Sequence, residues 1–177
     1  MDKKEKTIHS ELIYKGRILD LYKDDVVCPN GAKSVREVVR KGKAACVIAL
    51  LNDKIILEKQ YRYPYDEIMI EVPAGKSDKD EETKTTAIRE LEEETGYKAK
   101  TIKFLGTLYP TVAYTDELID VYFATDLEKT HTHLDFDEEL ELFLASPNEV
   151  EEMIKEGKIK DSKTIIAFYL YKIKIGY

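Results

Sequence analysis

Hydrophobic and polar positions in the first third of the chain follow the pattern of β-strands. β-branched and aromatic residues fill Ile8–Tyr14 and Ile18–Val27. Pro29-Asn30-Gly31 is a tight-turn signal, and another strand pattern follows it at Val35–Val39. We therefore expect antiparallel strands at the N-terminus.

The next segment predicts strands of a buried sheet. Ala44–Leu51 is continuously apolar, which is typical of a strand that is covered on both faces. A turn at Asn52-Asp53 leads into a second strand, Lys54–Gln60. Ile68–Val72 is a third, short strand that ends at Pro73-Ala74-Gly75.

A helical pattern then runs from about Asp80 to Thr95, and Gly96 stands where a helix would end. Ser146 begins a capping-box pattern with Pro at the first helical position, and Gly157 would end that helix. A last, strongly apolar helix is expected from Ser162 to Ile173. Further strands are expected at Ile102–Tyr109, Leu118–Thr125 and Leu140–Leu144.

Three helices that interrupt the order of many strands predict an α/β (α+β) fold, with a mixed sheet between helical layers. The length of 177 residues fits one domain with a small N-terminal extension. We divide the chain into an extension, residues 1–42, and a main domain, residues 43–177. Hydrophobic residues make up 43% of the chain, which is enough for a real core.

Charge and composition exclude several classes of protein. A net charge of −7 argues against a general nucleic-acid binder, which needs a basic face, but it fits a site that concentrates cations. Cys28 and Cys46 form no CxxC pair, and we interpret Cys46 as a small buried side chain. No signal peptide follows Met1, and no apolar run is long enough to span a bilayer. We expect a soluble, cytoplasmic protein that contacts no membrane.

The predicted helix at Asp80–Thr95 has an acidic face. Ile88, Leu91 and Thr95 share the face that we expect to pack on the sheet. We place the following residues on the opposite side: Glu90, Glu93 and Glu94. Like charges at i,i+4 cost a few tenths of a kcal/mol, and the helix dipole disfavours acids in the last turns. A divalent cation would remove this penalty, although a Glu-rich face that is simply solvated is the common alternative.

The residues around this helix favour the cation. Five residues separate Gly75 from Glu81, and seven more lead to the run Arg89-Glu90-Leu91-Glu92-Glu93-Glu94-Thr95-Gly96-Tyr97. This spacing resembles the box of the Nudix family without a gap, and all seven fixed identities are present. Tyr97 is a mild departure, because the family more often has an aliphatic residue there.

The resemblance implies a Nudix-type α/β/α sandwich and a set of metal ligands. Glu90 and Glu94 would hold the metal ions, with help from Glu93 and from the backbone carbonyl of Ala74. Arg89 stands four residues before Glu93, so it can pair with that carboxylate and fix its direction. Gly75 would allow a sharp turn at a place where a side chain would block a ligand. Glu81 would have a supporting role.

Beyond the box, most of the chain resembles the ADP-ribose pyrophosphatase branch of the family. The segments that carry this resemblance are Arg36–Val39, Ala44–Val47, Glu58–Arg62, Glu71–Gly75 and Lys158–Thr164. It implies that Arg36 and Arg62 contact the substrate, although a solvated strand arginine is the alternative for each. It also implies a homodimer in which two subunits exchange their N-terminal sheets.

The loop at Thr111–Glu117 departs from the branch, which usually has Ser-Pro-Gly before an aromatic residue and an acidic pair. Here Val112-Ala113 replaces Pro-Gly, whereas Tyr114 and the acidic pair Asp116-Glu117 are kept. We expect Glu117 to be a substrate-binding residue. The resemblance also implies a general base in the acidic stretch Asp135–Glu141, where Glu138 fits the alignment best and Glu139 and Glu141 are competitors.

The sequence thus predicts Mg²⁺-dependent hydrolysis of ADP-ribose to AMP and ribose 5-phosphate, or of a related nucleoside-diphosphate sugar. Mn²⁺ can substitute for Mg²⁺ in this hypothesis. Glu93, Glu138 and Arg89 are the expected catalytic residues. A house-cleaning hydrolase of nucleoside triphosphates, a non-catalytic Nudix-fold nucleotide sensor and an acidic interaction domain are the alternatives.

Overall fold

The computed structural model describes residues 3–134, 136 and 138–176. They form two compact units, each of which is described by itself. The first unit holds the described residues up to Gly42 together with Tyr109–Leu118, and the second holds Lys43–Leu108 and the residues from Ile119 onward. None of the helices in the described part of the chain is both long and apolar enough to cross a membrane.

The first unit is built on a three-stranded antiparallel sheet. The strands are β1 (Lys6–Lys15), β2 (Asp20–Val27) and β3 (Lys33–Arg40), in the order β1-β2-β3. The N–H group of Val39 donates to the carbonyl of Tyr114 at 2.7 Å, so the 109–118 segment joins this sheet. The predicted N-terminal antiparallel strands are confirmed.

The second unit contains a seven-stranded sheet with the core order β10-β5-β4-β9-β8, in which β6 pairs with β5 and β7 pairs with β4. Its strands are β4 (Lys43–Leu51), β5 (Lys54–Arg62), β6 (Glu67–Glu71), β7 (Ala74–Lys76), β8 (Tyr97–Leu108), β9 (Leu118–Lys129) and β10 (Leu140–Ala145). A single 3₁₀ turn, η1 (Tyr63–Tyr65), joins β5 to β6.

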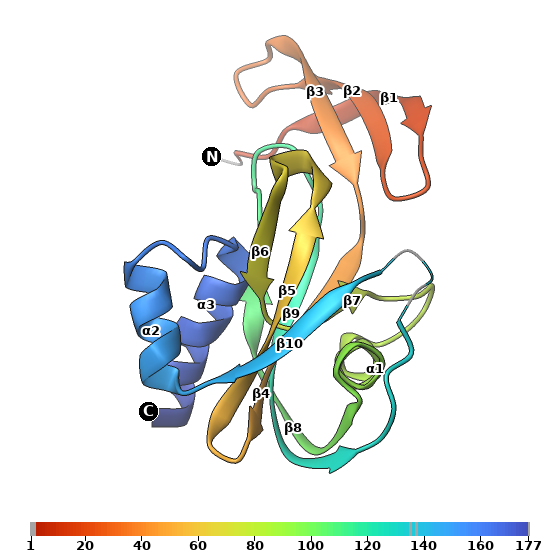
Figure 1. Cartoon of the computed structure of the whole chain (residues 1–177). Coiled ribbons are helices and arrows are strands. Elements are labelled where there is room, and N and C mark those ends of the chain that lie inside the picture. The colour runs from red at the N-terminus through yellow and green to blue at the C-terminus, as the bar shows by residue number, and fades with distance from the viewer. Residues whose placement is uncertain (1–2, 135, 137, 177) are drawn as a thin grey trace. The chain divides into compact units, whose positions relative to one another are not determined.

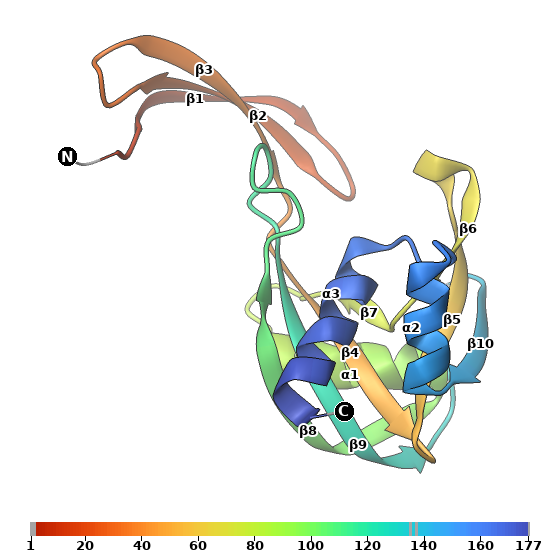
Figure 2. The ribbon, with the colours of Figure 1, turned by 90° about the vertical axis from the view of Figure 1, so that its left-hand side faces the viewer.

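Helices cover both faces of this sheet (Figures 1 and 2). They are α1 (Thr83–Thr95), α2 (Pro147–Lys155) and α3 (Ser162–Tyr171), and the π-helical segment η2 (Lys172–Gly176) continues α3. Alternate residues of β4 enter two separate cores. Val47 packs in the cluster that contains Leu91 of α1, whereas Ile48 packs in the cluster that contains Phe168 of α3. This two-sided burial explains the unbroken apolar run of β4, and the predicted α/β/α sandwich with a mixed sheet is confirmed.

The element boundaries differ in places from those that the pattern predicts. Helix α1 begins at Thr83 rather than near Asp80, because Asp80 is left-handed (φ 66°) and Glu82 is extended. It ends as expected at Gly96, which is also left-handed (φ 70°). The predicted capping box at Ser146 is present in full. Strand β7 was not predicted, because only three residues of the Pro-Ala-Gly turn region pair with β4.

Candidate active site

The site is built where β7 passes the side of α1. A side chain at Gly75 would meet the carboxyl carbon of Glu90, since a Cβ atom there would lie 1.9 Å from it. The backbone of Gly75 does not have a positive φ, so the sharp turn is not the reason for a glycine here. What the missing side chain provides is room for the Glu90 carboxylate against the strand.

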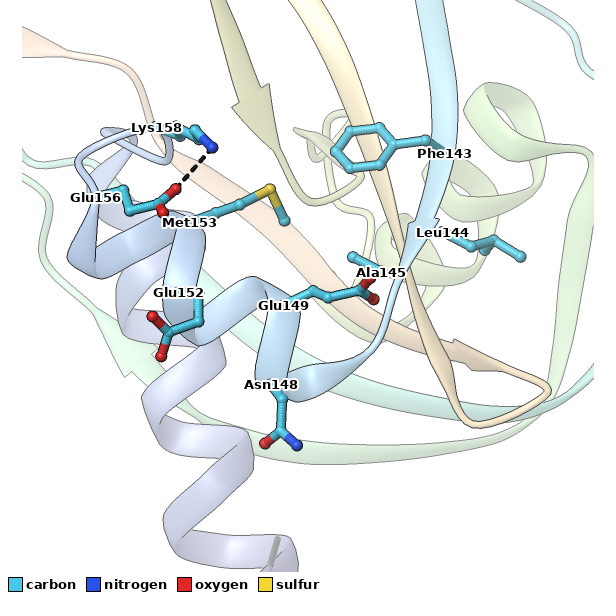
Figure 3. Close-up of a pocket in the computed structure, with 9 residues that line it drawn as sticks. All are labelled: Phe143, Leu144, Ala145, Asn148, Glu149, Glu152, Met153, Glu156 and Lys158. Carbon is cyan, nitrogen blue, oxygen red and sulfur yellow. Dashed lines mark ion pairs between the residues drawn. The ribbon is translucent and has the colours of Figure 1, made fainter.

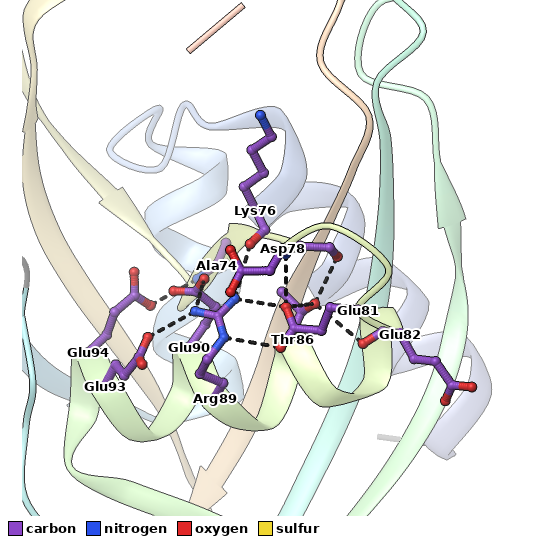
Figure 4. Close-up of polar contacts among 11 residues, drawn as sticks. Ala74, Lys76, Asp78, Glu81, Glu82, Thr86, Arg89, Glu90, Glu93 and Glu94 are labelled. Atoms are coloured by element: carbon purple, nitrogen blue, oxygen red, sulfur yellow. Dashed lines mark hydrogen bonds and ion pairs between the residues drawn. The ribbon is translucent and has the colours of Figure 1, made fainter. Parts of the chain in front are cut away.

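Arg89 organises the acidic groups on this side of α1 (Figure 4). Its guanidinium donates to both oxygens of Glu81 at 3.2 and 3.0 Å, to Glu90 at 2.7 Å and to Glu93 at 3.0 Å. It also donates to the carbonyl of Lys76 at 3.1 Å, which fastens the helix to β7. The expected contact between Arg89 and Glu93 is therefore present. These bonds from Arg89 lower the pKa of Glu81 to about 2.

Glu94 is buried, with 5% of its surface exposed, and one of its oxygens accepts a hydrogen bond from the N–H group of Ala74 at 3.0 Å. The placement of Glu94 on the outer face of the helix was wrong. Three residues advance a helix by roughly 300°, so Glu94 lies only about 60° from Leu91 and beside the apolar stripe. Burial raises the pKa of Glu94 well above its usual range, and the charges of Glu58 and Glu90 raise it further.

Glu138 approaches the same region from the loop before β10. The side-chain amide of Gln60 donates to a Glu138 oxygen at 3.1 Å. The Glu138 charge also contributes to raising the pKa values of Glu90 and Glu94, after the larger effect of burial on each. Glu139 is exposed and Glu141 pairs with a lysine at 2.7 Å. Asp135 and Asp137, from the same predicted stretch, lie outside the described residues.

The expected substrate residues have partners within the chain. Arg62 forms a two-pronged ion pair with the buried Glu71, at 2.6 and 2.8 Å, and Lys163 binds the same carboxylate. Arg36 and Glu117 belong to the first unit. There Arg36 pairs with Glu5 at 2.5 Å, and Glu117 pairs with Lys41 at 2.8 Å.

Two buried carboxylates escaped the sequence analysis. Glu58 on β5 is 1% exposed and Glu71 on β6 is 2% exposed, and the two are paired directly across the strands. Both lie in segments that carry the family resemblance, Glu58–Arg62 and Glu71–Gly75. In these segments, however, the resemblance implied functions only for other residues, such as Arg62 and Ala74. The positions of Glu58 and Glu71 in apolar strand runs, Ile55–Glu58 and Ile68–Val72, were the available signal, because a charged residue in a buried strand needs a partner.

The described residues contain no group of three His, Cys, Asp or Glu side chains already arranged to hold a metal ion. Arg89 engages Glu90 and Glu93, and Glu94 is engaged by Ala74. The donor set nevertheless fits a hard divalent cation. Carboxylate oxygens are the ligands such ions prefer, and one Glu58 oxygen is buried without a hydrogen-bond partner.

A hollow lies between β10 and α2 (Figure 3). Phe143 and Met153 give it an apolar lining. Its acidic groups already have local roles, because Glu149 closes the capping box of α2 and Glu156 pairs with Lys158 at 2.7 Å. The acidic side of α1 is therefore the stronger candidate for chemistry.

Comparison with known proteins identifies the family of the chain. The model of the NUDIX domain matches residues 40–168, and the model of the nucleoside diphosphate sugar hydrolase N-terminal domain matches residues 5–39. The chain is 44% identical to the methanol dehydrogenase activator of Bacillus methanolicus, over 92% of this chain and 90% of that protein. It is 38% identical to the ADP-ribose pyrophosphatase of Bacillus subtilis (strain 168), over 96% and 94% of the two chains.

A solved structure shares the fold. The crystal structure of an ADP compounds hydrolase superposes with a TM-score of 0.88 over 98% of this chain and 96% of that chain. The two sequences are 21% identical, so this likeness concerns the fold alone.

Proposed function

The chain belongs to the Nudix family of hydrolases, and from this premise we propose that it hydrolyses the pyrophosphate bond of ADP-ribose, or of a related nucleoside-diphosphate sugar, with Mg²⁺ as cofactor. The products from ADP-ribose are AMP and ribose 5-phosphate. The 38% identical relative named an ADP-ribose pyrophosphatase supports this substrate class. The observation that carries the proposal is the set of carboxylates held on α1, where Arg89 donates to Glu90 and Glu93 and the N–H group of Ala74 donates to the buried Glu94.

Arg89 and the acidic residues around it have distinct functions in this proposal. Bound divalent cations supply charge neutralisation of the pyrophosphate and an acidified water. Glu90, Glu94 and the Ala74 carbonyl would hold these cations, with Glu93 as a further carboxylate ligand. Arg89 holds the three acids Glu81, Glu90 and Glu93 around one guanidinium, because it donates to all of them. Mg²⁺ fits a site of few carboxylates, and Mn²⁺ can substitute.

Glu138 is the proposed general base. Its carboxylate takes a proton from the attacking water as the new oxygen–phosphorus bond forms and the bond to the bridging oxygen breaks. Gln60 donates to one Glu138 oxygen at 3.1 Å, which steadies the carboxylate. A base placed within hydrogen-bond reach of the water contributes roughly 10²–10⁴-fold to the rate.

Arg36, Arg62 and Glu117 are the proposed substrate-binding residues. Arg62 is held by Glu71 but keeps 39% of its side chain exposed. One edge of the guanidinium is therefore open to a phosphate or a nucleobase of the substrate. Arg36 is 42% exposed in its pair with Glu5, an ion pair that an anionic ligand can replace.

We further propose a homodimer formed through residues 1–42, with residues 43–177 as the hydrolase domain, and a location in the cytoplasm. Sheet β1–β3 carries large apolar side chains that a single chain leaves open, among them Ile8 at 53%, Ile13 at 51% and Val35 at 45% exposure. A three-stranded sheet with such a surface gains stability when a second subunit covers it.

A product assay tests the proposed function. The purified protein is incubated with ADP-ribose, GDP-mannose and ATP in separate reactions, each with Mg²⁺, with Mn²⁺ or with EDTA, and the products are separated by ion-exchange chromatography. We expect AMP from ADP-ribose in the metal-containing reactions only. Turnover of ATP alone would favour a triphosphate hydrolase, and binding of nucleotides without any turnover would favour a sensor.

A further inference from the structure

Glu58 is a carboxylate in an unfavourable place. It lies on strand β5 with 1% of its surface exposed, and it is among the largest fully buried side chains of the described residues. Its Oε2 atom has no hydrogen-bond partner among the described residues. A buried polar atom without a partner costs about 1–3 kcal/mol, and more if it is charged. Because of this cost, a buried carboxylate without a partner indicates a bound ligand or a functional role.

The neighbouring charges do not satisfy Glu58. Its cross-strand neighbour on β6 is Glu71, another buried acid. Arg62 and Lys163, the cations whose charges act on Glu58, are hydrogen-bonded to Glu71, because Arg62 donates to both oxygens of Glu71 and Lys163 donates to one of them. On the other side, Glu58 pairs across the strands with Leu142 of β10, which offers no charge.

The face of β5 that carries Glu58 leads to the candidate active site. Side chains two residues apart on a strand share a face. Ile56 packs in the cluster that contains Leu91 of α1, so this face of β5 meets the acidic helix. Gln60, two residues beyond Glu58, donates to Glu138. Glu58 therefore lies on β5 between Ile56, which packs on the α1 side of the sheet, and Gln60, which donates to the proposed base Glu138.

Electrostatic coupling agrees with this placement. Apart from burial, the Glu58 charge is the largest influence that raises the pKa of Glu94. Burial raises the pKa of Glu58 itself to about 8, and Glu71 and Glu138 add to the effect, while Lys163 and Arg62 oppose it. The charges of Glu58 and Glu138 thus both act on the buried carboxyl group of Glu94.

We propose that Glu58 supplies a further carboxylate oxygen to the divalent-cation site, which then draws on β5 as well as on α1 and β7. This inference rests on the proposed metal-dependent hydrolysis. The cation satisfies the unpaired Oε2 atom and offsets the repulsion between Glu58 and Glu94. A cluster with this extra acid binds a cation more tightly than the box glutamates alone.

Titration calorimetry with Mn²⁺ on the full chain, without substrate, tests the proposal. We expect Glu58→Gln to weaken Mn²⁺ binding by roughly 10–100-fold, the range found when a group supporting a metal site is removed. The matched control is Glu92→Gln on α1. It removes the same charge from a residue that pairs with Lys98 at 2.9 Å, and we expect no more than a small change in affinity.

Thermal unfolding separates a metal role from a structural one. Glu58→Leu replaces the buried acid by an apolar side chain of similar size, so the metal-free protein should be as stable as wild type or more stable. Both Glu58 variants should show a smaller rise in Tm on adding Mn²⁺ than wild type does. Unchanged Mn²⁺ affinity and an unchanged rise in Tm would overturn the role of Glu58 while leaving the proposed hydrolase intact. Failure of wild type to bind Mn²⁺ would overturn both.

Discussion

Gly75 on β7 and Glu90 on α1 are packed so closely that the strand has no room for a side chain where the helix passes it. A Cβ atom on residue 75 would lie 1.9 Å from the carboxyl carbon of Glu90 and 2.0 Å from one of its oxygens. Because the obstacle is the end of a flexible side chain rather than backbone, Glu90 can move aside. The glycine therefore determines where a carboxylate stands, not whether the chain folds.

Gly75→Ala should impair metal binding and catalysis more than stability. The added methyl group displaces Glu90 from β7, and we expect Mn²⁺ affinity to fall by roughly 10–100-fold, with kcat/KM falling in step. Calorimetry and steady-state kinetics measure these two quantities. Gly106→Ala is the matched control, because a methyl group there makes only ordinary contacts, with Leu170 at 3.5 Å and with the Lys174 amine at 4.0 Å. Equal effects of the two substitutions would contradict the steric explanation.

Arg89→Ala should lower both stability and activity. It leaves Glu81, Glu90 and Glu93 without their shared donor, and removing a group from such a hydrogen-bonded network destabilises a protein by about 0.5–3 kcal/mol. Chemical denaturation gives the stability and steady-state assays give kcat. Arg89→Lys keeps the charge but not the fork of donors, so it should recover only part of either loss. Full recovery by lysine would show that charge alone matters.

The pairing of Glu81 with Arg89 predicts a particular dependence of stability on pH. Arg89 lowers the pKa of Glu81 from 4.5 to about 2 in the folded protein. A depressed pKa contributes stability above the unfolded value, and this contribution is lost as the pH falls from about 4.5 to about 2. Wild type should therefore lose more stability across this window than Glu81→Gln, in metal-free buffer. Parallel stability curves for the two proteins would argue against the pairing.

The fold was predictable because its signals are local and periodic. The apolar run Ala44–Leu51 predicts a strand with two covered faces, and the capping box at Ser146 predicts the start of a helix. Strand β7 was not predictable in the same way. It is three residues long and exists because Ala74 and Gly75 pair with Cys46 and Ala45 of a distant strand. Pairing partners of this kind are set by tertiary structure and leave no periodic pattern.

The site shows a similar division. The spacing from Gly75 to Glu94 identified the acidic helix, and the contact between Arg89 and Glu93 followed from helical geometry. The burial of Glu94 and the unpaired oxygen of Glu58 could not be predicted from the sequence, because both depend on what packs against the side chain. Glu58 is the clearer case, since only the sheet order reveals that its neighbours are Glu71 and Leu142.

Glu94→Gln should abolish most activity while keeping the fold. Its oxygen would still accept the hydrogen bond from the Ala74 N–H group, but the amide carries no charge to hold a cation. Glu94 is buried beside Glu58 and Glu90, so removing its charge should raise the stability of the metal-free protein at neutral pH. Differential scanning calorimetry in EDTA tests the second part. A variant with near-normal kcat at saturating Mg²⁺ would show that Glu94 is not a metal ligand.

Glu138→Gln should separate catalysis from binding. If Glu138 takes the proton from the attacking water, kcat should fall by roughly 10²–10⁴-fold, while KM and Mn²⁺ affinity change little. Glu139→Gln and Glu141→Gln are the controls, because Glu139 is exposed and Glu141 pairs with Lys59 at 2.7 Å, so neither should alter kcat by more than a few-fold.

Gln60 offers a further check through its 3.1 Å bond to Glu138. Gln60→Leu should lower kcat less than Glu138→Gln does, because it loosens the carboxylate without removing it. Rapid-quench measurement of a single turnover isolates the chemical step from product release. If all three glutamate variants stay within a few-fold of wild type in that measurement, the base lies elsewhere, and Glu93 becomes the next residue to replace.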